Sequence, residues 1–201
     1  PPVGPTPATG FASACRCLLI HTADALVLVD TGCGDRFDAK GRDIFAVDPT
    51  VTLANSLAAA GVSPVDITHV LFTHLHFDHC GGNCKITSAP VIVQKKEWEW
   101  ATKSEPDLGY YPSDYQTGQD IQQVNGEHDI FGDASVVCLP TYGHTPGHQS
   151  LRVRTENTEF VLTGDACYLR QTLENLHLPG VLYNREDALA SLRTLRELQS
   201  R

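Results

Sequence analysis

Four side chains that bind metals well fall within six residues, in the segment His74-Leu75-His76-Phe77-Asp78-His79. Neutral imidazole nitrogens and carboxylate oxygens suit zinc and its first-row neighbours. A single histidine here would fit a solvated polar turn, but a cluster this dense favours a metal site. The preceding run, Thr68–Phe72, is apolar and β-branched, which predicts a buried strand that ends at the cluster. A strand end can point its side chains in different directions, so this turn can serve two metal centres.

Two later turns carry further ligand candidates. His144 lies in Gly143-His144-Thr145-Pro146-Gly147-His148, and Asp165 follows the last expected strand. A carboxylate such as Asp165 can bridge two cations, and two cations about 3.5–4 Å apart share a water and deprotonate it near neutral pH. The result is a nucleophile for esters, lactones, thioesters or phosphoesters. We expect His144 to be a ligand and His148 to support one.

Asp30 ends another expected strand, directly before the glycine-rich turn Thr31–Gly34. An aspartate at this place can simply form the turn. It can equally hydrogen-bond a histidine that binds a metal and so fix the orientation of its ring. Spacing alone leaves both interpretations open.

The chain predicts two runs of strands, each followed by helix. The expected strands are residues 14–20, 25–30, 68–72, 90–94, 121–124, 135–139, 149–154 and 159–162. The expected helices are residues 51–58 with Gly61 as the cap, 95–102, and a last helix with Asn184 as its N-cap and an apolar face of Leu189, Leu192, Leu195 and Leu198. Residues 35–48 and 104–118 are expected to be loops. Every ligand candidate follows a strand, so two sheets packed face to face would gather them at one edge.

Composition narrows the class of protein. The chain has 201 residues, 41% of them hydrophobic, and a formal net charge of −9. It is long enough for one domain with a continuous core. The negative charge argues against a nucleic-acid partner, which requires a basic stripe, and no apolar run is long enough to predict a membrane span. Seven irregularly spaced cysteines without a visible leader favour reduced thiols in a cytoplasmic protein.

The combined pattern resembles the metallo-β-lactamase superfamily. It consists of His74-x-His76-x-Asp78-His79, then His144 in Gly-His-Thr-Pro-Gly-His, then Asp165. Within the superfamily the segments 74–82, 144–151 and 164–168 are most similar to the N-acyl homoserine lactonases, which quench quorum sensing. The resemblance implies an α+β fold, the αββα sandwich, in which two packed mixed β-sheets are flanked by helices. It predicts a single domain over residues 1–201.

The resemblance also implies a ligand set for two zinc ions, with other first-row divalent metals as options. By the family pattern His74, His76 and His144 hold one metal, Asp78 and His79 belong to the other, and Asp165 bridges. Asp30 matches an aspartate that supports a ligand histidine, which favours the second interpretation of that residue.

The implied reaction is the opening of an acyl homoserine lactone by a hydroxide that bridges the metals. Tyr168, three residues after Asp165, matches a tyrosine that hydrogen-bonds the substrate carbonyl, although it can also be a buried tyrosine with a satisfied hydroxyl. Asp78 would hand a proton to the departing ring oxygen. Phe11, Tyr110 and Tyr111 are candidates for an apolar acyl pocket.

One feature departs from the family pattern. The family closes the second metal site with a further histidine after the last helix, whereas this sequence ends at Arg201. We therefore expect the domain to lack that C-terminal strand and turn, as well as an N-terminal strand usual in the family. Alternative functions are hydrolysis of another lactone, ester or thioester, or metal binding without catalysis. The resemblance leaves a homodimer open.

Overall fold

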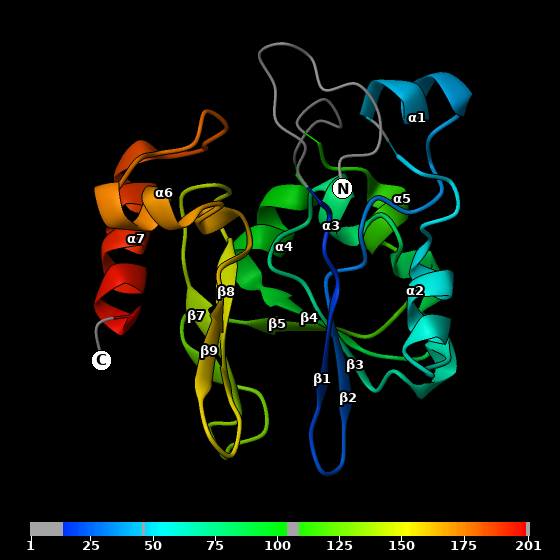
Figure 1. Cartoon of the computed structure of the whole chain (residues 1–201), viewed down its shortest axis with the longest axis horizontal. Helices are drawn as coiled ribbons and strands as arrows, with labels where there is room; N and C mark the ends of the chain where they lie inside the picture. Colours follow the sequence, from blue (N-terminus) through cyan, green and yellow to red (C-terminus); the bar gives the residue numbers. More distant parts are fainter. Residues whose placement is uncertain (1–13, 46, 104–108, 200–201) are drawn as a thin grey trace.

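The protein is two β-sheets packed face to face between helices, as the computed structural model in Figure 1 shows. The structure describes residues 14–45, 47–103 and 109–199. The αββα sandwich expected from the sequence is confirmed. Phe11 and residues 104–108 of the expected loop lie outside the described residues.

The first sheet is mixed. Its five strands lie in sequence order, with β1 antiparallel to β2 and the other neighbours parallel. They are β1 (Leu18–His21), β2 (Leu26–Val29), β3 (His69–Leu71), β4 (Val91–Gln94) and β5 (Ile121–Val124). The parallel strands β2, β3 and β4 are mainly apolar, with His69 and Gln94 as their polar ends, as expected of strands that are covered on both faces.

The second sheet is antiparallel throughout the described residues. Its order is also sequential. Its strands are β6 (His128–Asp129), β7 (Val136–Pro140), β8 (Gln149–Arg154) and β9 (Glu159–Leu162).

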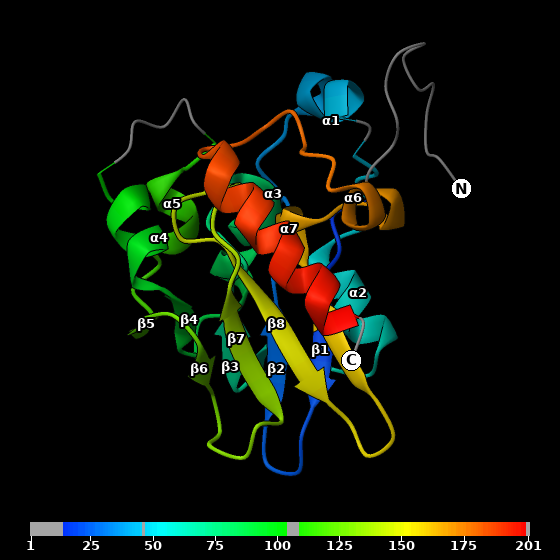
Figure 2. The same ribbon diagram turned by 90° about the vertical axis from the view of Figure 1, so that its left-hand side faces the viewer.

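Helices cover the outer side of each sheet. Helix α2 flanks the first sheet, while α7 crosses the outer face of the second sheet (Figures 1 and 2). The helices are α1 (Ala39–Phe45), α2 (Leu53–Ala59), α3 (Phe77–Cys80), α4 (Lys95–Ala101), α5 (Pro112–Tyr115), α6 (Arg170–Asn175) and α7 (Arg185–Gln199). Short 3-10 helices lie at Pro64–Asp66, Asn83–Lys85 and Gly164–Ala166.

The alternation of side chains along the strands builds two apolar layers. Val27 and Val29 face the second sheet and pack with Cys138 and Leu151. Leu28 points the other way, into the layer beneath α2. This period of two is the ordinary geometry of a strand, and it makes β2 and β3 shared walls of both layers.

The expected boundaries hold for most elements. Strands β5, β8 and β9 coincide with the expected ranges, and α4 lies within its range. Asn184 caps α7, since its Oδ1 accepts hydrogen bonds from the backbone N–H groups of Glu186 and Asp187 at 2.9 and 3.0 Å. The last helix is therefore confirmed together with its cap.

Three local predictions were wrong, and two short elements were not predicted. Helix α1 occupies part of residues 35–48 and begins where the Asp38 carboxylate accepts the backbone N–H of Gly41, a start signal hidden in a polar run. Helix α5 lies inside the expected loop 104–118, and β6 and α6 were not foreseen. Strand β1 begins at Leu18 rather than at Ala14. The four unforeseen elements have only two to seven residues, too few to show a clear period in the sequence.

Helix α7 supports the turn that carries His144. The Ser191 hydroxyl donates to the carbonyl of Tyr142 at 2.7 Å, and the backbone N–H of Tyr183 donates to the carbonyl of Gly143 at 2.9 Å. Gly143 packs so closely on Ala188 that a Cβ atom there would overlap it, and its φ of +128° is one that glycine tolerates best.

Replacing Leu192 with alanine should therefore lower the free energy of unfolding by about 2–5 kcal/mol, because this fully buried side chain leaves a cavity under α7. Urea denaturation followed by circular dichroism measures the change. Arg193→Ala, one residue along on the exposed side of the helix, should change stability by less than about 0.5 kcal/mol. Equal losses for both variants would contradict the docking of α7 described here.

Candidate metal centre

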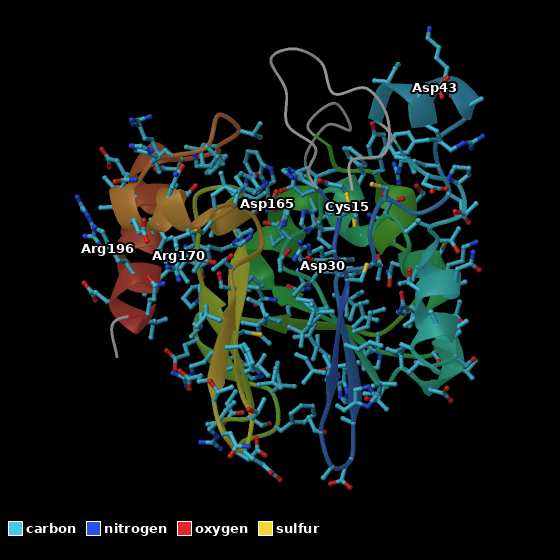
Figure 3. All side chains as sticks on the ribbon, viewed as in Figure 1. Cys15, Asp30, Asp43, Asp165, Arg170 and Arg196 are labelled. Carbon is cyan, nitrogen blue, oxygen red and sulfur yellow. The ribbon has the colours of Figure 1, made fainter. Side chains whose placement is uncertain are left out.

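The ligand candidates gather at one end of the two sheets. Figure 3 shows Asp30, which follows β2, and Asp165, which follows β9, at this end of the facing sheets. Two groups of side chains there have ligand atoms within 4.8 Å of one another among the described residues, namely His74, His76 and His144, and His74, His79 and Asp165.

In the first group three ring nitrogens converge. Nδ1 of His76 lies 3.0 Å from Nε2 of His74 and 3.2 Å from Nε2 of His144. Burial lowers the pKa of all three imidazoles, to about 3 for His76, so the rings are neutral near neutral pH. Each neutral ring carries one proton, and the position of that proton decides which nitrogen offers a lone pair.

The hydrogen bonds fix that position for two of the rings. Nδ1 of His144 lies 3.1 Å from the carbonyl of Val181, an acceptor only, so Nδ1 carries the proton. Nδ1 of His74 lies 3.1 Å from the Thr73 hydroxyl, whose own proton goes to Asp30 at 2.9 Å, so this Nδ1 also donates. Both Nε2 atoms therefore direct lone pairs at the same point, an arrangement that a cation stabilises.

Asp165 lies between the two groups. One carboxylate oxygen is 3.3 Å from Nε2 of His79, and the other is 3.4 Å from Nε2 of His144. The carboxyl of Asp78 is more exposed, with an oxygen 3.8 Å from Nε2 of His79. Asp165 can thus reach ions held by either group.

Asp30 makes three close contacts with its carboxylate. It accepts hydrogen bonds from the backbone N–H of Thr73 at 2.8 Å, from the Thr73 hydroxyl, and from Nδ1–H of His79 at 2.8 Å. Burial, which lowers the pKa of an imidazole, is outweighed at His79 by Asp30 and Asp165, which raise its pKa well above the usual value. The proton on His79 offsets carboxylate charge that a divalent cation would offset when bound.

His148 is fully buried beside the cluster. Its Nε2 accepts the backbone N–H of Asp165 at 3.0 Å, so its proton sits on Nδ1 and is donated to the carbonyl of Thr141 at 3.1 Å. His148 therefore uses both nitrogens in hydrogen bonds to the backbone, one of them to the segment that carries Asp165.

Tyr168 lies at the rim of the cluster. It is 39% exposed, and its hydroxyl donates to Asp165 at 2.9 Å. Burial of the ring and the Asp165 carboxylate raise the pKa of Tyr168, so the hydroxyl keeps its proton. Tyr168 is not the buried tyrosine that was the alternative interpretation.

The two described candidates for the acyl pocket differ. Tyr111 is partly exposed, and the Arg36 guanidinium lies 4.4 Å from its ring centroid. Tyr110 is buried, with its ring centroid 4.8 Å from that of His76 and its hydroxyl on Glu97. The expectation that Tyr110 lines a pocket is wrong, because its polar end is directed into the protein behind His76.

Sequence reasoning missed Glu97 and Thr73, which contact the ligand turns from behind. Glu97 follows two lysines in a helix that also holds Trp98 and Trp100. A glutamate in such a charged stretch is expected to face the solvent. No local signal shows that it is fully buried. Thr73 directly precedes the histidine cluster, and only that adjacency points to it.

Comparisons with known proteins agree with this geometry. A family model described as the metallo-beta-lactamase superfamily matches residues 10–200. The chain belongs to this superfamily. An N-acyl homoserine lactonase from Bacillus sp is 34% identical over 194 residues, which cover 90% of this chain and 75% of that protein. The lactonase AttM from Rhizobium radiobacter is 37% identical over 152 residues, 71% of this chain and 57% of its own length.

Solved structures give the same result. A crystal structure of a quorum-quenching N-acyl homoserine lactone lactonase superposes with a TM-score of 0.80 at 32% identity, covering 92% of this chain and 74% of that one. A hydrolase of the same substrate class, with N-hexanoyl-L-homoserine bound at its catalytic metal centre, superposes with a TM-score of 0.78 at 31% identity, covering 92% and 76%. The superfamily fold and the converging lone pairs together imply a divalent metal at this centre.

Asp30→Asn should weaken metal binding by about 10–100-fold, because an outer partner that orients a ligand histidine is lost. Asparagine tolerates the left-handed backbone at this position, where φ is +56°, so the turn itself should persist. In either orientation its NH2 group faces a donor, the backbone N–H of Thr73 in one and Nδ1–H of His79 in the other.

Competition with a chromophoric zinc chelator measures the affinity. His69→Ala, a change at the far end of β3 from the cluster, is the control and should leave affinity unchanged. Wild-type affinity in the Asp30 variant would show that the contact with His79 does not orient a ligand.

Proposed function

We propose that the protein is a metal-dependent hydrolase that opens the lactone ring of N-acyl homoserine lactones. The observation that carries the proposal is the hydroxyl of Tyr168, held on Asp165 at the open rim of the histidine cluster. A substrate carbonyl that enters at this rim meets a proton donor and the metal ligands together. The relatives above that share this fold at 30% identity or more support the same reaction class.

The proposal assigns two zinc ions to the centre. His74, His76 and His144 would hold the first, Asp78 and His79 the second, and Asp165 would bridge the two. Other first-row divalent metals can take the same ligands. When bound, such metals polarise a carbonyl oxygen and lower the pKa of a coordinated water.

Tyr168 and Asp78 perform the proton and charge handling in this scheme. The Tyr168 hydroxyl, which already donates to Asp165, turns to the carbonyl oxygen as negative charge develops on it. Asp78 is the more exposed carboxylate of the cluster. It takes the proton that the attacking water gives up as the new C–O bond forms, and it passes this proton to the ring oxygen as the ring C–O bond breaks. His148, Asp30 and Thr73 keep their positions throughout.

The rim also fits the acyl chain of the proposed substrate. Leu169, which follows Tyr168 in the chain, has an exposed side chain. Val181, whose backbone carbonyl accepts from Nδ1 of His144, is exposed as well. Tyr111 and Phe77 lie beside the ligand segment with their ring centroids 6.1 Å apart, and the Arg36 guanidinium contacts both rings. An exposed apolar rim around a polar centre favours a substrate with one hydrolysable head and one apolar tail.

Oligomeric state and location stay predictions. In the described residues no helix is long and apolar enough to cross a membrane. All seven cysteines are free thiols. We also propose that the protein has a single domain and forms a homodimer. Size-exclusion chromatography with light scattering tests the homodimer.

Tyr168→Phe should lower kcat for N-hexanoyl homoserine lactone by about 10²–10³-fold, because the transition state loses one preorganised donor. The rate of acid release, followed with a pH indicator, measures it. Tyr183→Phe, which removes the hydroxyl of another exposed tyrosine, is the matched control and should retain the wild-type rate. A Tyr168 variant as fast as the wild type would refute the oxyanion role.

Removal of metal should abolish lactone opening, and zinc should restore it in proportion to the zinc bound. The chelated protein is titrated with zinc while metal content and rate are followed together. Zinc binding without hydrolysis of any lactone, ester or thioester would favour the metal-binding module. Faster hydrolysis of thioesters or simple esters than of lactones would move the assignment to another hydrolase of the superfamily.

A further inference from the structure

Glu97 is a carboxylate buried completely behind the metal centre. Four donors satisfy it. Oε1 accepts the backbone N–H of Leu75 at 3.0 Å and the Tyr110 hydroxyl at 2.9 Å. Oε2 accepts the Thr145 hydroxyl at 2.7 Å and the backbone N–H of Gly147 at 3.1 Å.

Three of the four donors, those of Leu75, Thr145 and Gly147, belong to the turns that present the first metal group. Leu75 separates His74 from His76 in the chain, and Thr145 directly follows His144. One carboxylate therefore ties the turn after β3 to the turn between β7 and β8, which come from different sheets. Oε1 accepts from the turn after β3, and Oε2 accepts from the turn between β7 and β8.

The same contact reaches His76 through Tyr110. The hydroxyl of Tyr110 is fixed on Glu97, and its ring packs against the imidazole of His76 with the two centroids 4.8 Å apart. His76 is the ring whose Nδ1 lies between the other two nitrogens of the group. The orientation of the His76 ring therefore depends on its contact with Tyr110.

The turn between β7 and β8 packs closely on Glu97 at Gly147. A Cβ atom added at Gly147 would overlap the backbone and the Cβ atom of Glu97. Burial raises the pKa of Glu97, whereas the hydrogen bonds from Thr145, Leu75, Tyr110 and Gly147 lower it. A carboxylate with four donors and no space around it is a fixed point between the two turns.

We propose that Glu97 is a positioning residue that sets the spacing of His74, His76 and His144 by clamping the two turns that carry them. The proposal rests on the metal centre assigned above, but not on the identity of the substrate. It separates two supports, because Asp30 contacts His79 of the second group and Glu97 contacts the turns of the first. Loss of Glu97 should therefore affect one group more than the other.

Glu97→Gln tests the clamp with almost no change in shape. Glutamine keeps one acceptor oxygen and gains an NH2 group, which is a donor only. In either amide orientation the NH2 group faces a backbone N–H, that of Leu75 or that of Gly147, and neither can reverse its role. One turn must move away or lose its hydrogen bond.

Cobalt(II) is the probe for the effect. Chelator competition gives the affinities, and the visible absorption of cobalt reports the ligand geometry at each step of a titration. We expect Glu97→Gln to weaken the first group by about 10–100-fold and to change its absorption, as expected when an outer partner of metal ligands is lost. The affinity of the second group should change less. A wild-type titration curve and spectrum would overturn the proposal.

A pair of tyrosines separates positioning from general stability. Tyr110 and Tyr115 are both buried, and both donate a hydroxyl proton to α4, Tyr110 to Glu97 and Tyr115 to the carbonyl of Ala101 at 2.8 Å. Tyr110→Phe should weaken cobalt binding and shift its absorption, whereas Tyr115→Phe should do neither at a similar cost in thermal stability. Equal effects of the two tyrosine variants on cobalt affinity and absorption would show that Glu97 has no specific role in positioning the ligands.

The tyrosine pair also covers the case in which Glu97→Gln does not fold, because Tyr110→Phe removes only one of the four donors. A protein that binds cobalt as expected but opens no lactone would refute the proposed function and leave the clamp intact. Unchanged cobalt binding in both the Glu97 and Tyr110 variants, with lactone opening present in the wild type, would refute the clamp and leave the proposed function intact.

Discussion

The metal centre depends on the convergence of ring nitrogens from turns that are far apart in the sequence. Two Nε2 lone pairs, from His74 and His144, point toward Nδ1 of His76 at 3.0 and 3.2 Å. A neutral His76 ring carries at most one proton on Nδ1, so it can donate to at most one of these two lone pairs. A rigid surrounding keeps the three nitrogens together, and a bound cation would accept their lone pairs. The sandwich has to supply that rigidity before a metal binds.

Buried carboxylates supply much of it. Asp30 fixes Thr73 and His79, and Glu97 fixes the backbone on either side of the first group. Each is a charged group taken out of water, which is favourable only because three or four donors surround it. The centre is therefore surrounded by hydrogen bonds that would be costly to break separately. Such an arrangement moves little, and this suits a site that must hold its ligands at fixed spacing.

The two sheets determine where these residues meet. Strands β2 and β3 run in parallel, so Asp30 and the histidine cluster leave the first sheet at the same edge. The second sheet brings His144, His148 and Asp165 to that edge from strands β7, β8 and β9. Helix α7 then closes the back of the His144 turn through Ser191 and Ala188. The apolar layers on both faces of the first sheet hold the arrangement together.

The sequence by itself determined the ligand types, their spacing and most of the strands, because alternation and clustered histidines are local patterns. It could not find α1, α5, β6 or α6, which have two to seven residues and are too short to show a clear period. Tertiary structure alone decided that Glu97 is buried, that Tyr110 supports His76, and which nitrogen of His74 and His144 is free. Burial and tautomer depend on partners distant in the chain, and no local pattern of residues encodes those partners.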